Sequence, residues 1–334
     1  MNYNEDHIQA LIKFFESGCK REQLLGLELE HFVVDARSGR SLPYSGGVEL
    51  ILEKMAPNYG QPILSGNRII GIKRDGADIT LEPAAQLEVS IGPYSEVSQI
   101  ARTYEEFTSI ISPILKDMGC KLICLGYQPV SRIDELLLIP KERYKHMEAY
   151  FESTGTCGKH MMKGTAATQV SIDYRDEEDF KKKFRVANIM GPFLSLMYDN
   201  APTFDGKPAK RKLLRTFIWD NVDPARAGIA TGALDSDFGF YEYAKYVLDA
   251  PVVFEVDDFN PEHITSMVFP DVRLKTNIEI RMVDSIPIDQ ALDYTKLLKD
   301  IFYNEARLNA IYKATLGVTG NQIAKLKEVL YEEF

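Results

Sequence analysis

The chain has 334 residues, of which 45% are hydrophobic, and its 49 acidic residues against 39 basic ones give a formal charge of −10. A chain of this length and composition can bury one large core or two ordinary ones, which excludes a disordered protein. The negative charge opposes nonspecific attraction to nucleic acid and to anionic membranes, so we expect neither as a partner.

In the first third of the chain, apolar spacing predicts both helices and strands. The dipeptide Asp75-Gly76 is the strongest short hairpin signal in the sequence and is expected to join two antiparallel strands. The elements expected here are a helix over 3–18, a strand over 25–35, a helix near 47–56 and strands over 67–74, 77–84 and 85–92.

The rest of the chain mixes helices and strands and ends in a helical tail over 288–334. The stretch TLGVTGN is expected to mark a break between helices of this tail. No repeat, low-complexity tract or linker divides the sequence, so we expect a single α+β domain over 1–334 around a mainly antiparallel sheet. The other expected elements are helices over 96–119 and 177–199, strands over 121–130, 165–174 and 271–284, and a loop over 201–212.

No apolar run reaches the roughly 20 residues that cross a bilayer. The start, MNYNEDHIQALIKFFE, is polar and acidic, unlike a signal peptide. A cytoplasmic protein without a membrane partner is therefore expected. The four cysteines form no CxxC motif, which argues against a zinc site and against a disulfide framework.

Two glutamates on the strand over 25–35 raise the question of function. Alternate side chains of a strand share a face about 6.5 Å apart, so Glu28 and Glu30 share one face while Leu27 and Leu29 take the other. Half-buried strands normally hold β-branched or aromatic residues at such positions, because unpaired carboxylates are costly where water is scarce. For any one strand, a plain solvent-exposed face is the alternative interpretation.

Glutamates recur in the same way at Glu82, Glu88 and Glu279, and Arg281 is the only cation on these faces. Neighbouring carboxylates repel each other by on the order of 1 kcal/mol per close pair in water. Hard divalent ions would hold them together, because the candidate ligands are all oxygens, and Mg²⁺ often completes its coordination with phosphates. The pattern therefore indicates a nucleoside triphosphate, although the sequence contains no P-loop and no GxGxxG motif.

Several blocks of the sequence occur in the order found in a known family. They are LGLELEHF, ITLEPAAQLEVSIGP, GYQPVSR, IPKERYKHM, AATQVSIDY, FRVANIMGPF, DGKP, LLRTFIW and FPDVRLKTNIEIR. Over residues 20–285 the chain resembles the plant-type glutamate–cysteine ligases, a family similar to glutamine synthetase in fold and chemistry. The resemblance implies a curved antiparallel sheet, or half-barrel, with ATP, two or three Mg²⁺ ions and glutamate on its concave face and helices on its convex side.

The resemblance also implies roles for particular residues. Arg281 resembles the catalytic arginine that contacts the transferred phosphoryl group, and Arg215 and Trp219 lie in a block that resembles the glutamate-binding strand. Arg226 is a second candidate for binding the α-carboxylate of glutamate. Gln169 matches a metal-side position that related ligases fill with histidine. The implied magnesium ligands are Glu28, Glu30, Glu82, Glu88, Glu279 and Gln169.

The implied activity is an ATP-dependent ligase that joins the γ-carboxylate of L-glutamate to the amine of L-cysteine. ATP would convert the carboxylate into an acyl phosphate, while Mg²⁺ and Arg281 offset the charge of the transition state. The alternatives are a ligase with another amine acceptor, a catalytically silent nucleotide-binding regulatory protein and a two-metal phosphohydrolase. The connection 255–262 is several tens of residues shorter than is usual in this family, so a trimmed cover over the acceptor amine is expected.

Overall fold

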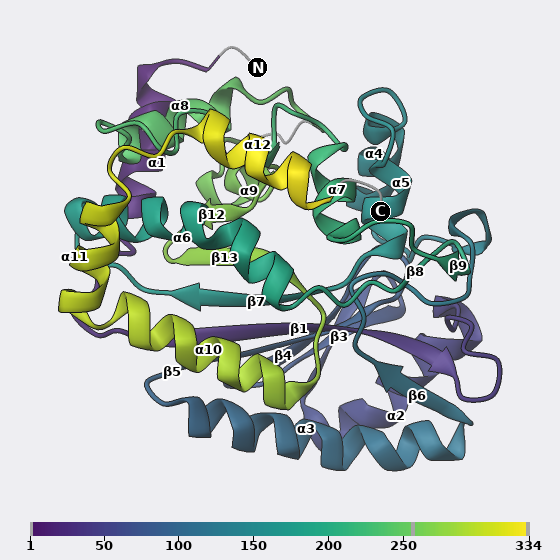
Figure 1. The fold of residues 1–334 in the computed structure, drawn as a ribbon. Coiled ribbons are helices and arrows are strands. Elements are labelled where there is room, and N and C mark those ends of the chain that lie inside the picture. Colours follow the sequence, from purple (N-terminus) through teal and green to yellow (C-terminus); the bar gives the residue numbers. More distant parts are fainter. Residues whose placement is uncertain (1–2, 255–257, 332–334) are drawn as a thin grey trace.

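The computed structural model describes residues 3–254 and 258–331, and its centre is a nine-stranded antiparallel sheet (Figure 1). Eight strands follow the order β12-β13-β7-β1-β5-β4-β3-β2, and β6 pairs with the far end of β1. The strands are β1 (Leu25–Asp35), β2 (Gln61–Ser65), β3 (Arg68–Lys73), β4 (Ala77–Leu81), β5 (Leu87–Tyr94), β6 (Cys120–Ile123), β7 (Ala167–Ile172), β12 (Val272–Leu274) and β13 (Ile278–Asp284). Two short pairs lie outside this sheet, β8 (Thr203–Phe204) with β9 (Lys207–Pro208) and β10 (Ala227–Gly228) with β11 (Phe269–Pro270).

Most of the longer helices pack against strands of the sheet, and shorter helices lie over its polar face. In Figure 1, α3 and α10 run alongside the sheet, and α6 lies against β13. The α-helices are α1 (Glu5–Glu16), α2 (Glu49–Tyr59), α3 (Val97–Asp117), α4 (Glu142–Phe151), α5 (Gly158–Gly164), α6 (Glu177–Met197), α7 (Leu214–Asp220), α8 (Phe240–Asp249), α9 (Pro261–Thr265), α10 (Ile288–Phe302), α11 (Glu305–Ala314) and α12 (Gly320–Leu330). No helix within the described ranges combines the length and apolar character needed to cross a membrane.

The apolar face of β1 anchors one continuous core. Leu27 and Leu29 are fully buried and belong to the same cluster as Val89 of β5, Val170 of β7 and Ile280 of β13. Because burial of apolar surface is the main favourable term in folding, this face fixes which way the opposite side chains of the strands point.

Several expectations are confirmed. The fold is of the α+β class, with an open, mainly antiparallel sheet and packed helices. The Asp75-Gly76 turn joins β3 to β4, and Gly76 has the positive φ of +77° that such a turn requires. The segment TLGVTGN separates α11 from α12, as predicted.

Other expectations are wrong. The strand predicted over 121–130 ends at Ile123, because the chain then leaves the sheet and Gly126 packs against Asp284 with no room for a side chain. The strand predicted over 271–284 is a hairpin, β12 and β13, with a turn between Leu274 and Ile278. The expected short connection at 255–262 lies partly outside the described residues. The sheet strand and the α-helices that the sequence did not predict are β2, α4, α5, α7, α8 and α9. The two-residue strands β8, β9, β10 and β11 were not predicted either.

Candidate active site

The polar faces of the central strands meet in the middle of the sheet. Glu30 of β1 is paired with Glu88 of β5, and Glu28 of β1 is paired with Gln169 of β7. Glu279 lies on β13, the next strand after β7. Directly opposed residues of an antiparallel pair have their side chains on the same face. The pairing therefore collects these predicted ligands on one face, as the alternation of the strands predicted.

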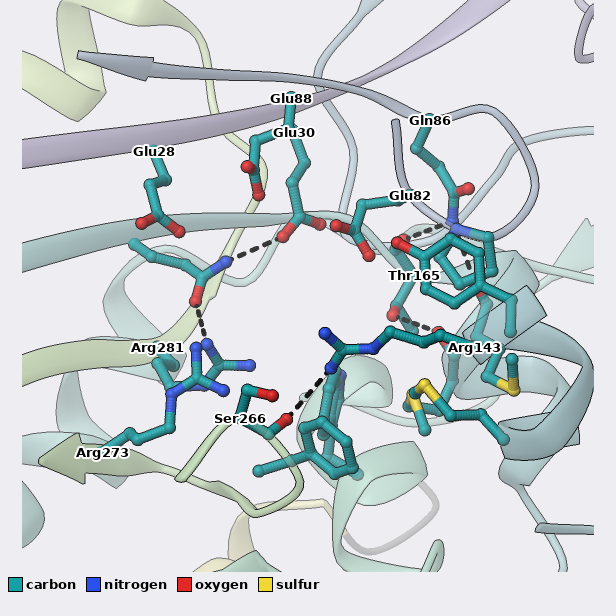
Figure 2. Close-up of a pocket in the computed structure, with 18 of the residues that line it drawn as sticks. Glu28, Glu30, Glu82, Gln86, Glu88, Arg143, Thr165, Ser266, Arg273 and Arg281 are labelled. Carbon is teal, nitrogen blue, oxygen red and sulfur yellow. Dashed lines mark hydrogen bonds between the residues drawn. The ribbon is translucent and has the colours of Figure 1, made fainter. Parts of the chain in front are cut away.

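This face forms one side of a cavity of about 270 Å³ (Figure 2). Side chains from α4, α5 and α7 and from the segments around α9 and β11 complete its wall. Of the predicted site residues, those that line the cavity are Glu28, Glu30, Glu82, Glu88, Gln169, Trp219 and Arg281. The remaining polar lining is Gln86, Arg143, Tyr144, Thr165, Ser266, Arg273 and Lys275.

Three carboxylates of the cavity, those of Glu28, Glu30 and Glu88, form no ion pair with any residue that the structure describes. Burial raises the pKa of Glu28 to about 8, with the charges of Glu88 and Glu279 adding to the effect. Burial and the charge of Glu82 raise the pKa of Glu30 well above its ordinary value, and the same causes raise the pKa of Glu88. Each of these groups would release its proton more readily if a cation entered the cavity.

Glu279 differs from the other glutamates because cations already surround it. Its carboxylate lies 2.5 Å from Nε of Arg273, 2.6 Å from Nζ of Lys275 and 3.5 Å from Nη1 of Arg281. Burial alone would raise the pKa of Glu279, but these charges outweigh burial and hold the pKa below its ordinary value. The expectation that Arg281 is the only cation on these faces is therefore wrong, because the hairpin pairs Arg273 with Glu279.

Gln169 connects the acidic and basic sides of the cavity. Its amide donates a hydrogen bond of 2.8 Å to Oε1 of Glu30, and its carbonyl accepts one of 2.6 Å from Nη1 of Arg281. The other oxygen of Glu30 accepts from the backbone N–H of Ala167 at 2.8 Å. These bonds hold the guanidinium of Arg281 beside the carboxylates, where Figure 2 shows it. Burial and Arg273 lower the pKa of Arg281 to about 10, so it stays charged at neutral pH.

Arg215 and Trp219 lie on helix α7, so the strand implied by the resemblance is wrong. Residues four apart on a helix are neighbours, and the guanidinium of Arg215 lies 5.4 Å from the ring centre of Trp219. Arg215 is 4% exposed and has no hydrogen-bond or ion-pair partner among residues 3–254 and 258–331. Arg215 does not line the main cavity but a small hollow that shares Trp219 and Arg281 with it. A buried arginine without an ion-pair partner is costly, so this position is suited to an anionic group.

Arg226 does not reach the cavity. Its guanidinium is fully buried and donates to the carboxylate of Asp223 at 2.6 Å, to the carbonyl of Met267 at 2.8 Å and to the hydroxyl of Tyr150 at 2.8 Å. It also donates to the carbonyl of Pro251. These bonds tie the neighbouring loops together, and a contact between Arg226 and a substrate would require breaking them.

Sequence reasoning missed the cation on the opposite wall, Arg143 of α4. Its Nη2 donates to the carbonyl of Ser266 at 3.1 Å across the cavity, as Figure 2 shows. Its Nε is buried and has no hydrogen-bond partner among the residues that the structure describes. The block IPKERYKHM contains four basic residues, three of them on α4, and the sequence gave no reason to select one of them. For Arg273 and Lys275 a signal existed, because both alternate in phase with Glu279.

The donor set of the cavity fits Mg²⁺, because it consists of carboxylate oxygens, and the described residues around it offer no thiolate or imidazole. Within the described part of the chain, no three side chains of His, Cys, Asp or Glu converge closely enough to hold a metal as they stand. Burial nevertheless raises the pKa values of Glu28, Glu30 and Glu88, and the cations around them do not compensate for it. Magnesium coordination stays a prediction that this chemistry supports.

In the absence of metal, the protein should lose stability as the pH rises from 6 to 9. The folded protein holds a proton on Glu28 up to a pKa of about 8, whereas an unfolded glutamate loses it near pH 4.3. The free energy of unfolding therefore falls by about 1 kcal/mol per pH unit in this window. Thermal unfolding in EDTA at several pH values measures this loss of stability.

Glu28→Gln should flatten this pH dependence, whereas Glu105→Gln, at an exposed position on α3, should leave it unchanged. Mg²⁺ added at pH 9 should restore stability to the wild-type protein more than to Glu28→Gln. Equal stabilisation of the two proteins would contradict a metal-binding role for Glu28.

A second cavity, of about 410 Å³, adjoins the first and shares Glu28 with it. It is lined by the start of β1 around Gly26, by the β3–β4 turn with Lys73, and by Asn277. The two cavities therefore follow one another along β1 and can accommodate an extended ligand.

Comparisons with known proteins agree with these observations. The family model described as glutamate-cysteine ligase family 2 matches residues 24–325. The chloroplastic glutamate–cysteine ligase of Arabidopsis thaliana is 29% identical, and the match covers 93% of this chain and 66% of that protein. The chloroplastic enzyme of Nicotiana tabacum is 28% identical, with 96% and 67% covered. The chain thus spans slightly less than two thirds of the length of the Arabidopsis relative.

A solved structure has the same fold. The crystal structure of the glutamate–cysteine ligase of Francisella tularensis in complex with AMP matches with a TM-score of 0.54 at 15% sequence identity. The match covers 93% of this chain and 71% of that one. At this identity the likeness concerns the fold alone.

Proposed function

The chain belongs to glutamate-cysteine ligase family 2, and from this premise we propose that it joins the γ-carboxylate of L-glutamate to the amine of L-cysteine at the expense of ATP. The observation that carries the proposal is the cavity itself. The cavity brings together three carboxylates that have no ion-pair partner among the described residues and the cation of Arg281. The three carboxylates are those of Glu28, Glu30 and Glu88, and burial raises their pKa values. Such a cavity suits a polyphosphate that arrives with its own metal ions.

The chemistry proceeds in two steps. The γ-carboxylate of glutamate attacks the γ-phosphorus of ATP, which releases ADP and forms an acyl phosphate. The amine then attacks the activated carbonyl carbon, loses a proton and displaces inorganic phosphate. Bound Mg²⁺, held by the cavity glutamates, would neutralise phosphate charge. No protein nucleophile is needed.

The residues of the chain bind and orient the reactants. Arg281, held by Gln169, offers its guanidinium to the transferred phosphoryl group. Arg215, buried and without a partner among the described residues, suits the α-carboxylate of glutamate at the wall formed by α7. Arg143 faces the main cavity from α4 and offers a further positive charge there.

We assign the nucleotide to the second cavity, which follows the main cavity along β1. The cavity around Gly26 and Lys73 would take the nucleoside end of ATP, with the phosphates reaching past Glu28. The Francisella tularensis ligase was solved with AMP, which supports nucleotide use by this fold.

We assign the acceptor amine to the apolar part of the main cavity, which is lined by Met147, Met161 and Met162. Methionine sulfur is polarizable and packs well against a small, soft side chain such as that of cysteine. A ligase that uses another small amine is the second candidate, because the same wall would accept other short apolar side chains.

A coupled assay of ADP release, with glutamate and a panel of amines, tests the proposal. We expect turnover that requires Mg²⁺, glutamate and cysteine together. Turnover with a different amine would keep the ligase chemistry and change the acceptor. Release of ADP without any amine would indicate a phosphohydrolase, and no release under any condition would contradict the ligase assignment.

A further inference from the structure

A buried lysine of the C-terminal helix lies behind the wall of the cavity. Lys327 of α12 is 4% exposed, and its Nζ is 2.6 Å from Oδ1 of Asp220 and 2.8 Å from Oδ2 of Asp271. In Figure 1, the end of α12 lies beside α7. Within α12, only Ile323 and Lys327 are buried. The helix is therefore anchored by one apolar side chain, that of Ile323, and by one ammonium group shared between two carboxylates.

Both carboxylates belong to segments that carry site residues. Asp220 is the last residue of α7 and directly follows Trp219. Asp271 joins β11 to β12, and its carbonyl accepts the backbone N–H of Arg281 at 3.0 Å. Asp271 also lines a small hollow behind the main cavity together with Arg215, Trp219 and Arg281.

Asp271 is thus a potential competitor for Arg215. It is one of the carboxylates whose charge acts on the buried guanidinium of Arg215, after Asp284 and Glu30. In the structure Asp271 pairs with Lys327, and Arg215 has no ion-pair partner in the described part of the chain. A buried carboxylate that lost its cation would draw the nearest available one.

We propose that Lys327 is a positioning residue that neutralises Asp271 and Asp220 and thereby keeps Arg215 free to bind the carboxylate of the substrate. The inference rests on the proposed function, in which that carboxylate belongs to glutamate. Lys327 acts through Asp271 and does not touch the substrate. Its replacement should therefore weaken the binding of glutamate and leave the binding of nucleotide unchanged.

The test compares Lys327→Met with the double variant Lys327→Met/Asp271→Asn. The single variant should raise the KM for glutamate by about tenfold or more and change the KM for ATP by less than about twofold. The double variant should return the glutamate KM close to that of the wild type, because asparagine at position 271 carries no charge that could compete for Arg215. Lys325→Met, at an exposed position of the same helix, is the matched control.

If Lys327 serves only to hold α12 in place, the test gives a different result. In that case both variants would impair activity alike, or kcat would fall with the glutamate KM unchanged, and either outcome overturns the proposal. If Lys327→Met does not fold, the double variant decides by itself. A glutamate KM near that of the wild type supports the proposal, and a raised one overturns it.

A second readout does not depend on turnover. Trp219 is the only tryptophan in the chain, so its fluorescence reports on the Arg215 wall. Lys327→Met should shift its emission and increase its quenching by acrylamide, and the double variant should reverse both changes. If no amine supports turnover, the ligase assignment fails while this measurement still tests the link from Lys327 to Arg215. An unchanged Trp219 signal in Lys327→Met overturns it.

Discussion

Replacing Arg281 with alanine should reduce ADP formation in the presence of glutamate and cysteine by about 100- to 1000-fold. The guanidinium faces the cavity and is held by the carbonyl of Gln169 at 2.6 Å, beside the carboxylates that are expected to bind metal. A fixed positive charge at this position stabilises the charge that spreads over the transferred phosphoryl group in the transition state. Alanine removes the charge, and water cannot replace it with the same orientation. Steady-state rates at saturating substrate measure the effect.

The protein should stay folded, because Arg281 is not needed to compensate Glu279. Arg273 and Lys275 both remain within 2.6 Å of that carboxylate. Arg102→Ala on α3, where the side chain is exposed, serves as the matched control and should retain wild-type rates. Normal turnover in Arg281→Ala would refute its catalytic role. A raised KM with an unchanged kcat would indicate that Arg281 contributes to ground-state binding and not to phosphoryl transfer.

The acidic face of the sheet could be predicted from the sequence because it depends on local geometry alone. Alternation along β1 places Glu28 and Glu30 opposite Leu27 and Leu29, whatever the strand order. Burial of the leucines then forces the glutamates to the other side. The strand neighbours decide only which other carboxylates join them, and the family resemblance supplied that information.

The β12–β13 hairpin could not be found from periodicity. Arg273 pairs with Glu279, six residues later, and an even separation preserves the alternation across the turn. A continuous strand and this hairpin therefore give the same pattern of faces. The consequence for the site is large, because only the hairpin brings Arg273 against Glu279 and neutralises it.

Helix α7 was missed for a similar reason. Arg215 and Trp219 are four residues apart, which places them on one face both in a strand and in a helix. The segment LLRTFIW is rich in branched and aromatic residues that favour strands, and tertiary packing overrides this preference. The shared face was therefore predictable, whereas the element type was not.

The positions of Arg143, Arg226 and Lys327 depend on contacts between segments far apart in the sequence. Arg143 meets Ser266, Arg226 meets Met267 and Lys327 meets Asp271. A single sequence gives no measure of such distances. It therefore could not distinguish the arginine that faces the cavity from the one that holds the loops together.

Replacing Glu30 with glutamine should reduce ligase turnover at least about 100-fold and raise the Mg²⁺ concentration needed for half-maximal rate. Glu30 lies at the centre of the acidic face, where burial and the charge of Glu82 raise its pKa well above the ordinary value. Glutamine keeps the size and one acceptor oxygen but removes the charge that would attract the cation. Titration of Mg²⁺ against initial rate, at saturating ATP, measures the change.

The same substitution should stabilise the metal-free protein above neutral pH. An ionised Glu30 is costly there, because burial and Glu82 both oppose its charge, and a neutral amide avoids this cost. Thermal unfolding at pH 9 in EDTA should therefore show a higher Tm for Glu30→Gln than for the wild type, while Glu105→Gln should show no difference. A loss of activity together with a gain of stability would separate a functional carboxylate from a structural one. Lower stability with an unchanged Mg²⁺ requirement would show instead that Glu30 serves mainly to hold Ala167 and Gln169 in place.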